Sequence, residues 1–136
     1  MLIEGPYGAF THHVRRSDRV VLIGAGVGVT PLRALLEDLP DGVEVSVIVR
    51  ASAETELVHH DEISALVNER RGSYHALIGS RSKIQLDRKT LRKLVPDIAD
   101  CDIYICGPGA FSSAVSTAAE QLGVSPDRIH LEVFSF

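Results

Sequence analysis

The chain has 136 residues, 45% hydrophobic and 24% charged, with a formal net charge of −4 at pH 7. That length fits one domain with a substantial core. Without a basic stripe, and with only 5% aromatic residues, it gives no reason to expect a nucleic-acid partner. No apolar run approaches the ~20 residues of a membrane span. The first four residues lack the features of a secretory signal.

The two cysteines indicate the redox environment. Cys101 and Cys106 are five residues apart in a run typical of a strand. An extended chain separates them by roughly 16 Å and points them to opposite faces, which excludes a disulfide. We therefore expect a reduced, cytoplasmic environment. His12 and His13 are adjacent, but no cluster of ligands completes a metal site nearby, so we expect no metal.

Residues 20–36 organise the rest of the chain. Residues 20–23 form a continuous apolar run that predicts a buried strand, and Gly24, Gly26 and Gly28 follow it. Thr30 is a candidate N-cap and Pro31 fits the first helical position. A helix that begins after a glycine loop offers free amides to an anion, and a pyrophosphate is the natural ligand. The alternative is a tight turn that serves packing alone.

The remaining pattern alternates strands and helices. We predict strands over residues 43–49, 74–78, 102–105 and 129–134, and helices over 57–71 and 87–95. The last helix shows its buried stripe at Phe111, Ala114, Val115, Ala118 and Leu122. Short loops between these elements predict an α/β fold: a five-stranded parallel sheet, in the order 3-2-1-4-5, with helices on both faces.

Three groups of side chains follow predicted strands, at the edge where open α/β sheets bind ligands. Arg50 and Ser52 come after the second strand. Ser80, Arg81 and Lys83 come after the third, and two cations with a hydroxyl suit a phosphate monoester. The alternative is an ordinary charged loop. The third group, residues 106–108, leaves the fourth strand and would face the glycine loop across one cleft.

Three motifs in order carry a family resemblance. These are Gly24-x-Gly26-x-Gly28-x-Thr30-Pro31, then Cys106-Gly107-Pro108, then Glu132-x-Phe134-x-Phe136. Together they resemble the NAD(P)-binding domain of the ferredoxin–NADP reductase superfamily, and most closely its branch of bacterial ferric reductases and NADPH oxidase-type flavoproteins. The resemblance covers essentially the whole chain. Residues 5–8, Gly-Pro-Tyr-Gly, resemble the segment that leaves the flavin domain.

The resemblance implies a role for individual residues. Residues 24–31, Val29 included, would carry the pyrophosphate of NADPH or NADH. Cys106, with Gly107 and Pro108, would line the nicotinamide pocket, although it could also be a small core residue. Glu132 would lie near the nicotinamide and flavin edges. Phe134 would stack on the flavin or simply pack in its strand. The pair Ser80-Arg81 would hold the 2′-phosphate of NADP, with contributions from Lys83, Arg50 and Ser52.

The resemblance also implies a partner. Residues 1–13 would end the connection to an FAD-binding domain, residues 14–136 would form the NAD(P)-binding domain, and the FAD-binding domain itself is absent from this chain. A hydride from nicotinamide needs an acceptor, so we expect a piece of a flavin-dependent oxidoreductase. Its electrons would go on to haem, iron–sulfur or ferric iron, and its parent could be anchored by a membrane haem domain. The alternative is a non-catalytic module that senses nicotinamide nucleotide and regulates a partner.

Overall fold

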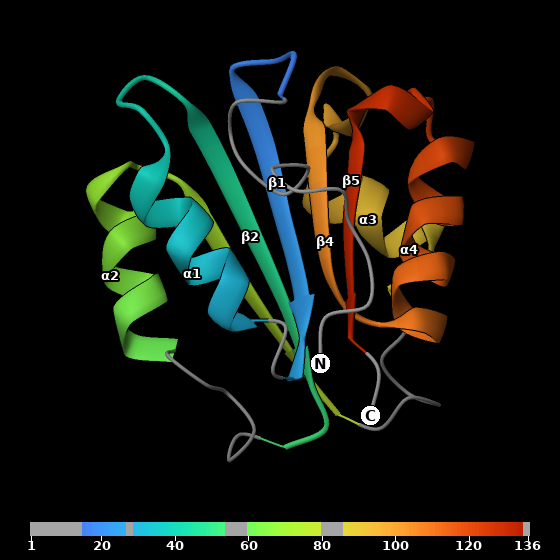
Figure 1. Ribbon diagram of the computed structural model, residues 1–136, viewed down its shortest axis with the longest axis horizontal. Coiled ribbons are helices and arrows are strands. Elements are labelled where there is room, and N and C mark those ends of the chain that lie inside the picture. Colours follow the sequence, from blue (N-terminus) through green and yellow to red (C-terminus); the bar gives the residue numbers. More distant parts are fainter. Residues whose placement is uncertain (1–14, 27–28, 54–59, 80–85, 135–136) are drawn as a thin grey trace.

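A computed structural model describes residues 15–26, 29–53, 60–79 and 86–134. Its centre is a parallel sheet of five strands in the order β3-β2-β1-β4-β5 (Figure 1), which confirms the predicted fold class and strand order. The strands are β1 (Arg19–Ala25), β2 (Glu44–Ala51), β3 (Ser73–Ile78), β4 (Asp102–Pro108) and β5 (Ile129–Phe134). The helices are α1 (Val29–Asp38), α2 (His60–Glu69), α3 (Arg88–Leu94) and α4 (Gly109–Gln121), with 3₁₀ turns η4 (Ile98–Asp100) and η5 (Pro126–Arg128).

Helices cover both faces of the sheet and create two cores. Along β1, Val20 and Leu22 face α1 and α2, whereas Val21 and Ile23 face α3 and α4. All four side chains are buried. Burial of one such side chain contributes about 1.5–3 kcal/mol. The apolar run of β1 therefore stabilises the helix packing on both faces of the sheet. The two cysteines are free and buried, Cys106 in the first core and Cys101 in the second, as the predicted opposite faces require.

Two helix ends show how the sequence sets their limits. Asp87 caps α3 by accepting the amide of Thr90 at 2.9 Å. At the end of α2, Arg71 takes the left-handed conformation with φ 57°, and the Gly72 amide reaches back to the Val67 carbonyl at 2.9 Å. Gly72 is needed there for space, because an added Cβ would lie 2.8 Å from Val45 Cγ1 and closer still to the Val45 carbonyl oxygen.

Three boundaries differ from the prediction. Helix α1 begins at Val29, so Thr30 lies in the first turn and is not the N-cap. Strand β2 continues through Arg50, because the Arg50 backbone pairs with both Ala25 and Leu77. Strand β4 likewise continues through Pro108, where an exit loop was expected.

Helix α4 turns the predicted stripe toward the core except at Ala114, since Phe111 and Leu122 also pack against that core. Its buried residues are Ser112, Val115, Ala118 and Ala119, whereas Ala114 is exposed. Alanine is a weak marker of burial, and the Ser112 hydroxyl is satisfied by the Gly107 carbonyl at 3.3 Å. Within the described ranges, no helix is long and apolar enough to cross a membrane.

Candidate functional site

Three predicted site residues form one row across neighbouring strands. Gly24 of β1 pairs with Cys106 of β4, and Cys106 pairs with Glu132 of β5. The row lies toward the carboxyl ends of these strands, where Figure 1 draws the arrowheads and the first turn of α1. The predicted cleft between the glycine loop and the fourth strand is therefore formed by adjacent strands.

The glycine loop leaves this row toward α1. Gly26 has φ 58°, and an added Cβ would meet nothing within 4 Å among the described atoms. A left-handed residue with open space beside it suits the close approach of a ligand to the backbone. At the helix start, Val29 is buried, Thr30 is exposed and Pro31 is half-buried, and Pro31 fits because first-turn amides have no partner within the helix. Gly28 lies outside the described residues.

Cys106 and Glu132 occupy different environments in the same row. Cys106 is fully buried, and burial, followed by the charge of Glu132, raises the pKa of its thiol. Glu132 is half-buried, and this partial desolvation raises the pKa of its carboxyl group. The thiol therefore stays neutral and acts through its shape, since the thiolate is the reactive form of cysteine. The Phe134 backbone pairs with Pro108, and its side chain lies outside the described residues.

Arg50 is placed differently from the prediction. It lies inside β2 and is only 9% exposed, and its Nη2 donates to the Gly79 carbonyl at 3.2 Å. The Gly79 amide in turn donates to the Ala51 carbonyl at 3.0 Å. Arg50 therefore holds the end of β3, directly before residues 80–85. Ser52 is exposed and follows β2 as expected, whereas Ser80, Arg81 and Lys83 lie outside the described residues.

A cavity of about 590 Å³ opens beside Arg50. The residues that sequence reasoning missed come from the start of α3 and the outer face of α4. Together with the end of β1, they line the cavity as Ala25, Leu86, Asp87, Arg88, Phe111 and Ala114. Two features could have pointed to these residues: Asp87 is the N-cap of α3, and Ala114 is exposed on α4. The topology places both residues at this edge of the sheet.

The Phe111 ring lies against the backbone of Gly107. A Cβ on Gly107 would be 2.9 Å from Phe111 Cδ2 and 3.5 Å from Ala25 Cβ. Gly107 therefore lets an aromatic ring reach the gap between β1 and β4. This places one aromatic wall of the cavity at the carboxyl ends of β1 and β4, on the face of the sheet opposite the Cys106 side chain.

A second cavity, of about 680 Å³, lies at the opposite, amino edge of the sheet. Its lining carries charges of both signs, and Arg19 pairs with Glu44 at 3.5 Å and with Asp97 at 3.2 Å. Although it is the larger of the two, it lacks the glycine loop and the predicted site residues. We therefore assign the candidate site to the carboxyl edge. Among the described residues, no group of three or more His, Cys, Asp or Glu side chains could hold a metal ion.

Comparisons with known proteins identify the family of the chain. The model of the oxidoreductase NAD-binding domain matches residues 22–117. The chain is 32% identical to a flavohemoprotein from Vibrio cholerae and 26% identical to the glycine betaine monooxygenase reductase subunit of Pseudomonas aeruginosa, in each case over 97% of this chain. It spans only 34% and 39% of those two relatives.

A solved structure has a similar fold. The flavohem-like FAD/NAD binding domain of nitric oxide dioxygenase from Vibrio cholerae superimposes with a TM-score of 0.70 at 32% identity, over 85% of this chain and 50% of that one. The family model covers more than half of the chain and includes the glycine loop, β4 and most of α4. The chain therefore belongs to the family of oxidoreductase NAD-binding domains.

Proposed function

We propose that this chain binds NADPH along the carboxyl edge of its sheet and presents the nicotinamide to a flavin held by another domain of the same parent protein. The observation that carries the proposal is the row Gly24–Cys106–Glu132 with the Arg50 cavity beside it. The row ends in a half-buried carboxyl group, and the cavity adds a buried guanidinium and an aromatic wall. A dinucleotide needs one elongated site that offers both polar groups and apolar surface.

The nucleotide would lie with its pyrophosphate over Gly26 and the first turn of α1. Free amides and the helix dipole favour an anion there. The adenosine end would enter the cavity, whose volume falls in the usual range for small-molecule sites. Phe111 offers a ring face for the base, and Arg50 brings a positive charge to the floor. We assign the 2′-phosphate to Ser80, Arg81 and Lys83, which follow Gly79, with Ser52, which follows β2 directly after the Ala51–Ile78 pair.

At the other end of the row, Cys106 would shape the nicotinamide pocket and Glu132 would border the nicotinamide and flavin edges. NADPH would supply a hydride there and FAD would accept it. The residues of this chain would contribute orientation, since burial and the neighbouring charge of Glu132 both raise the pKa of the Cys106 thiol and keep it neutral. Phe134, the last residue of β5, would stand next to the flavin.

The parent protein would supply the flavin and the final acceptor. We place the connection to its FAD-binding domain in residues 1–13 and the NAD(P)-binding domain in 14–136. A flavohemoprotein and a monooxygenase reductase among the relatives support haem or iron–sulfur as the acceptor, while ferric iron and a membrane haem domain stay narrower predictions.

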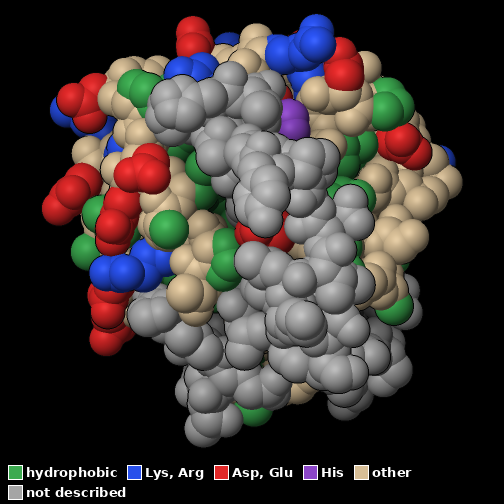
Figure 2. All heavy atoms as spheres, in the orientation of Figure 1, with side chains coloured by type: hydrophobic (Ala, Val, Ile, Leu, Met, Phe, Trp, Pro, Cys, Tyr) green, Lys and Arg blue, Asp and Glu red, His purple; other side chains and the backbone are tan. Residues whose placement is uncertain are grey.

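We also propose that this domain faces the cytoplasm. Figure 2 shows Asp and Glu gathered over α1 and α2 on this face, which gives no basic stripe for nucleic acid there.

Calorimetric titration of the chain with NADP⁺ and NAD⁺ tests the nucleotide site. We expect NADP⁺ to bind about tenfold more tightly, a difference of about 1.4 kcal/mol. Arg50→Gln should weaken NADP⁺ binding. Arg70→Gln is the matched control, because Arg70 also donates to a backbone carbonyl, that of Pro40 at 3.0 Å, but lies at the amino edge.

A second pair of variants tests the cavity. Phe111→Ala should weaken both nucleotides equally, whereas Leu122→Ala, which shortens a partly buried side chain packed against the same core, should leave binding unchanged. Equal binding of NADP⁺ and NAD⁺ would refute the assignment to NADPH. Equal effects of Phe111→Ala and Leu122→Ala would refute the cavity.

A further inference from the structure

Asp102 is a buried carboxylate that joins three separate segments. It begins β4 and is fully buried. Its Oδ1 accepts the backbone amides of Arg16 at 2.9 Å and Ser17 at 2.7 Å, and its Oδ2 lies 2.8 Å from His130 Nε2. Because an ionised carboxylate only accepts hydrogen bonds, His130 Nε2 carries the hydrogen. A charge in a low-dielectric interior is costly unless its partners are held in place. The contacts of Asp102 therefore position Arg16, Ser17 and His130 relative to one another.

The first of these segments is the leading segment, residues 15–18, which comes directly before β1. Its other side-chain contacts to the rest of the chain are exposed: Ser17 Oγ donates to the Asp100 carbonyl at 2.7 Å, and Arg16 pairs with Asp127 at 3.2 Å. The Asp18 carbonyl also accepts the Glu44 amide at 2.8 Å, where the sheet begins. Exposed side-chain contacts contribute little. Asp102 is therefore the buried anchor of the leading segment.

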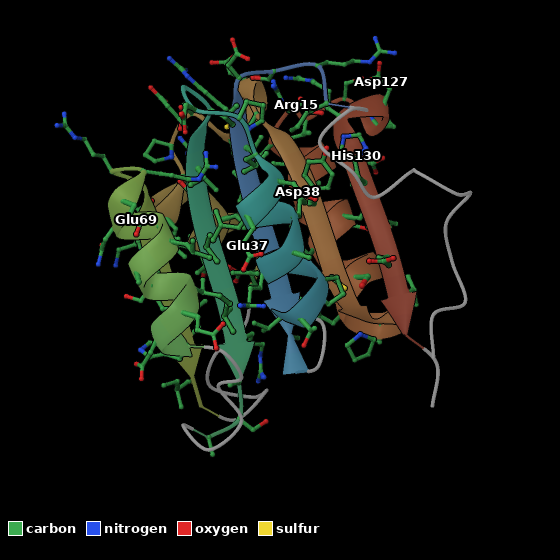
Figure 3. All side chains as sticks on the ribbon, turned by 60° about the vertical axis from the view of Figure 1, so that its left-hand side comes forward. Arg15, Glu37, Asp38, Glu69, Asp127 and His130 are labelled. Carbon is green, nitrogen blue, oxygen red and sulfur yellow. The ribbon has the colours of Figure 1, made fainter. Side chains whose placement is uncertain are left out.

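His130 connects the same anchor to β5. Its ring centroid lies 4.5 Å from that of Tyr104, its register partner on β4, and its side chain is only 10% exposed. Figure 3 shows His130 on β5 at the amino end of the sheet, with Arg15 and Asp127 at the same end. Side chains two apart in a strand point to one face, so His130 and Glu132 share a face of β5.

We propose that Asp102 and His130 are positioning residues: they hold the leading segment against β5 and thereby set where Glu132 stands relative to the flavin of the preceding domain. This rests on the function proposed above. The chain before residue 15 would lead to the flavin domain, while Glu132 would approach the flavin from this domain. Because one buried carboxylate contacts both the leading segment and β5, it would limit how the flavin domain can lie relative to Glu132.

Variants at His130 separate positioning from folding. His130→Phe keeps a ring beside Tyr104 but removes the donor to Asp102, and His130→Gln restores an N–H donor. His75→Phe is the matched control, because His75 is a half-buried strand histidine on β3, at the other edge of the sheet. In the chain itself, amide hydrogen exchange at Arg16 and Ser17 should quicken by about tenfold in His130→Phe, because local opening becomes easier. It should return toward the wild-type rate in His130→Gln.

The full-length parent protein gives the functional readout. In stopped-flow reduction of its flavin by NADPH, we expect His130→Phe to slow reduction by about tenfold, since small displacements are costly to hydride transfer. NADPH affinity should stay within about twofold, because the nucleotide site is at the opposite edge. His130→Gln should restore the rate, and His75→Phe should not change it.

Three outcomes would overturn the proposal. They are unchanged flavin reduction in His130→Phe, a parallel loss of nucleotide affinity, and an equal loss of rate in His75→Phe. If NADPH does not reduce the flavin of the wild-type parent, the proposed function fails first and the positioning role falls with it. A wild-type parent that is reduced normally, with an unaffected His130→Phe variant, refutes the positioning role alone.

Discussion

The two edges of the sheet are built on opposite principles. At the amino edge, Asp102 accepts three hydrogen bonds, and Arg19 pairs with Glu44 and Asp97. At the carboxyl edge, Gly26 stands beside open space, and burial raises the pKa of the half-buried Glu132. Charged groups at the first edge contact one another within the chain, whereas Gly26 and Glu132 at the second edge are the groups to which we assign the ligand.

This difference shows where stability and function are separated. Substitutions at the amino edge should change the free energy of unfolding and leave nucleotide binding intact. Substitutions at the carboxyl edge should have only small effects on stability, and those at the glycine loop should weaken nucleotide binding. Four substitutions test that separation.

The largest loss of stability is expected at Asp102. Asp102→Ala leaves the amides of Arg16 and Ser17 and the ring of His130 without their buried acceptor. We expect the free energy of unfolding to fall by about 3–5 kcal/mol, the usual cost of breaking a buried charged contact. Urea denaturation followed by far-UV circular dichroism measures it. Glu120→Ala, an exposed change on α4, should stay within about 0.5 kcal/mol, and equal losses would contradict the comparison.

Gly72→Ala should come next. The new methyl group would clash with the Val45 carbonyl oxygen and lie 2.8 Å from Val45 Cγ1. Backbone cannot move aside as a flexible side chain does, so we expect a loss of about 1–3 kcal/mol, typical of overpacking. The same denaturation experiment checks it. NADP⁺ affinity at the far edge should not change, and a drop in affinity would show that the edges are coupled.

The sequence predicted this scaffold better than its site. The unbroken apolar run of residues 20–23 predicted a strand covered on both faces, which the structure confirms, and the glycine spacing predicted a ligand at the carboxyl edge. The prediction placed Arg50 beyond the strand because its side chain is charged. Its alternation with Ser46 and Ile48 on one face would instead have kept it in the strand. In the structure the Arg50 guanidinium donates to the Gly79 carbonyl from within β2. The cavity was missed because its walls come from α3 and α4, far apart in the sequence and joined only by packing.

Gly26→Ala should divide stability from binding most clearly. Gly26 has φ 58°, so alanine there would cost about 1 kcal/mol of stability. The methyl group would also point into the space where we place the pyrophosphate, and NADP⁺ affinity should fall by about tenfold or more, because close backbone approach requires glycine. Gly42→Ala is the control, with φ 92° and equally open space in the turn before β2. Calorimetry on both variants should show weaker binding for Gly26→Ala alone.

The smallest effect concerns the half-buried carboxyl group of Glu132. Burial raises the pKa of Glu132 above its ordinary value of 4.5. Below the unfolded pKa the group is protonated in both states and its contribution to stability is fully present. That contribution is lost as the pH rises through the raised folded pKa, because folding then buries a charge.

Glu132→Gln removes this titration while keeping the shape of the side chain. The wild type should therefore lose stability relative to Glu132→Gln between about pH 4 and about pH 7. Urea denaturation of both proteins at the two pH values measures the difference, and Glu120→Gln, at an exposed position, should show none. A change of the opposite sign would mean that a cation compensates Glu132 in the folded chain. The carboxyl edge would then be as self-satisfied as the amino edge, and the contrast between them would fail.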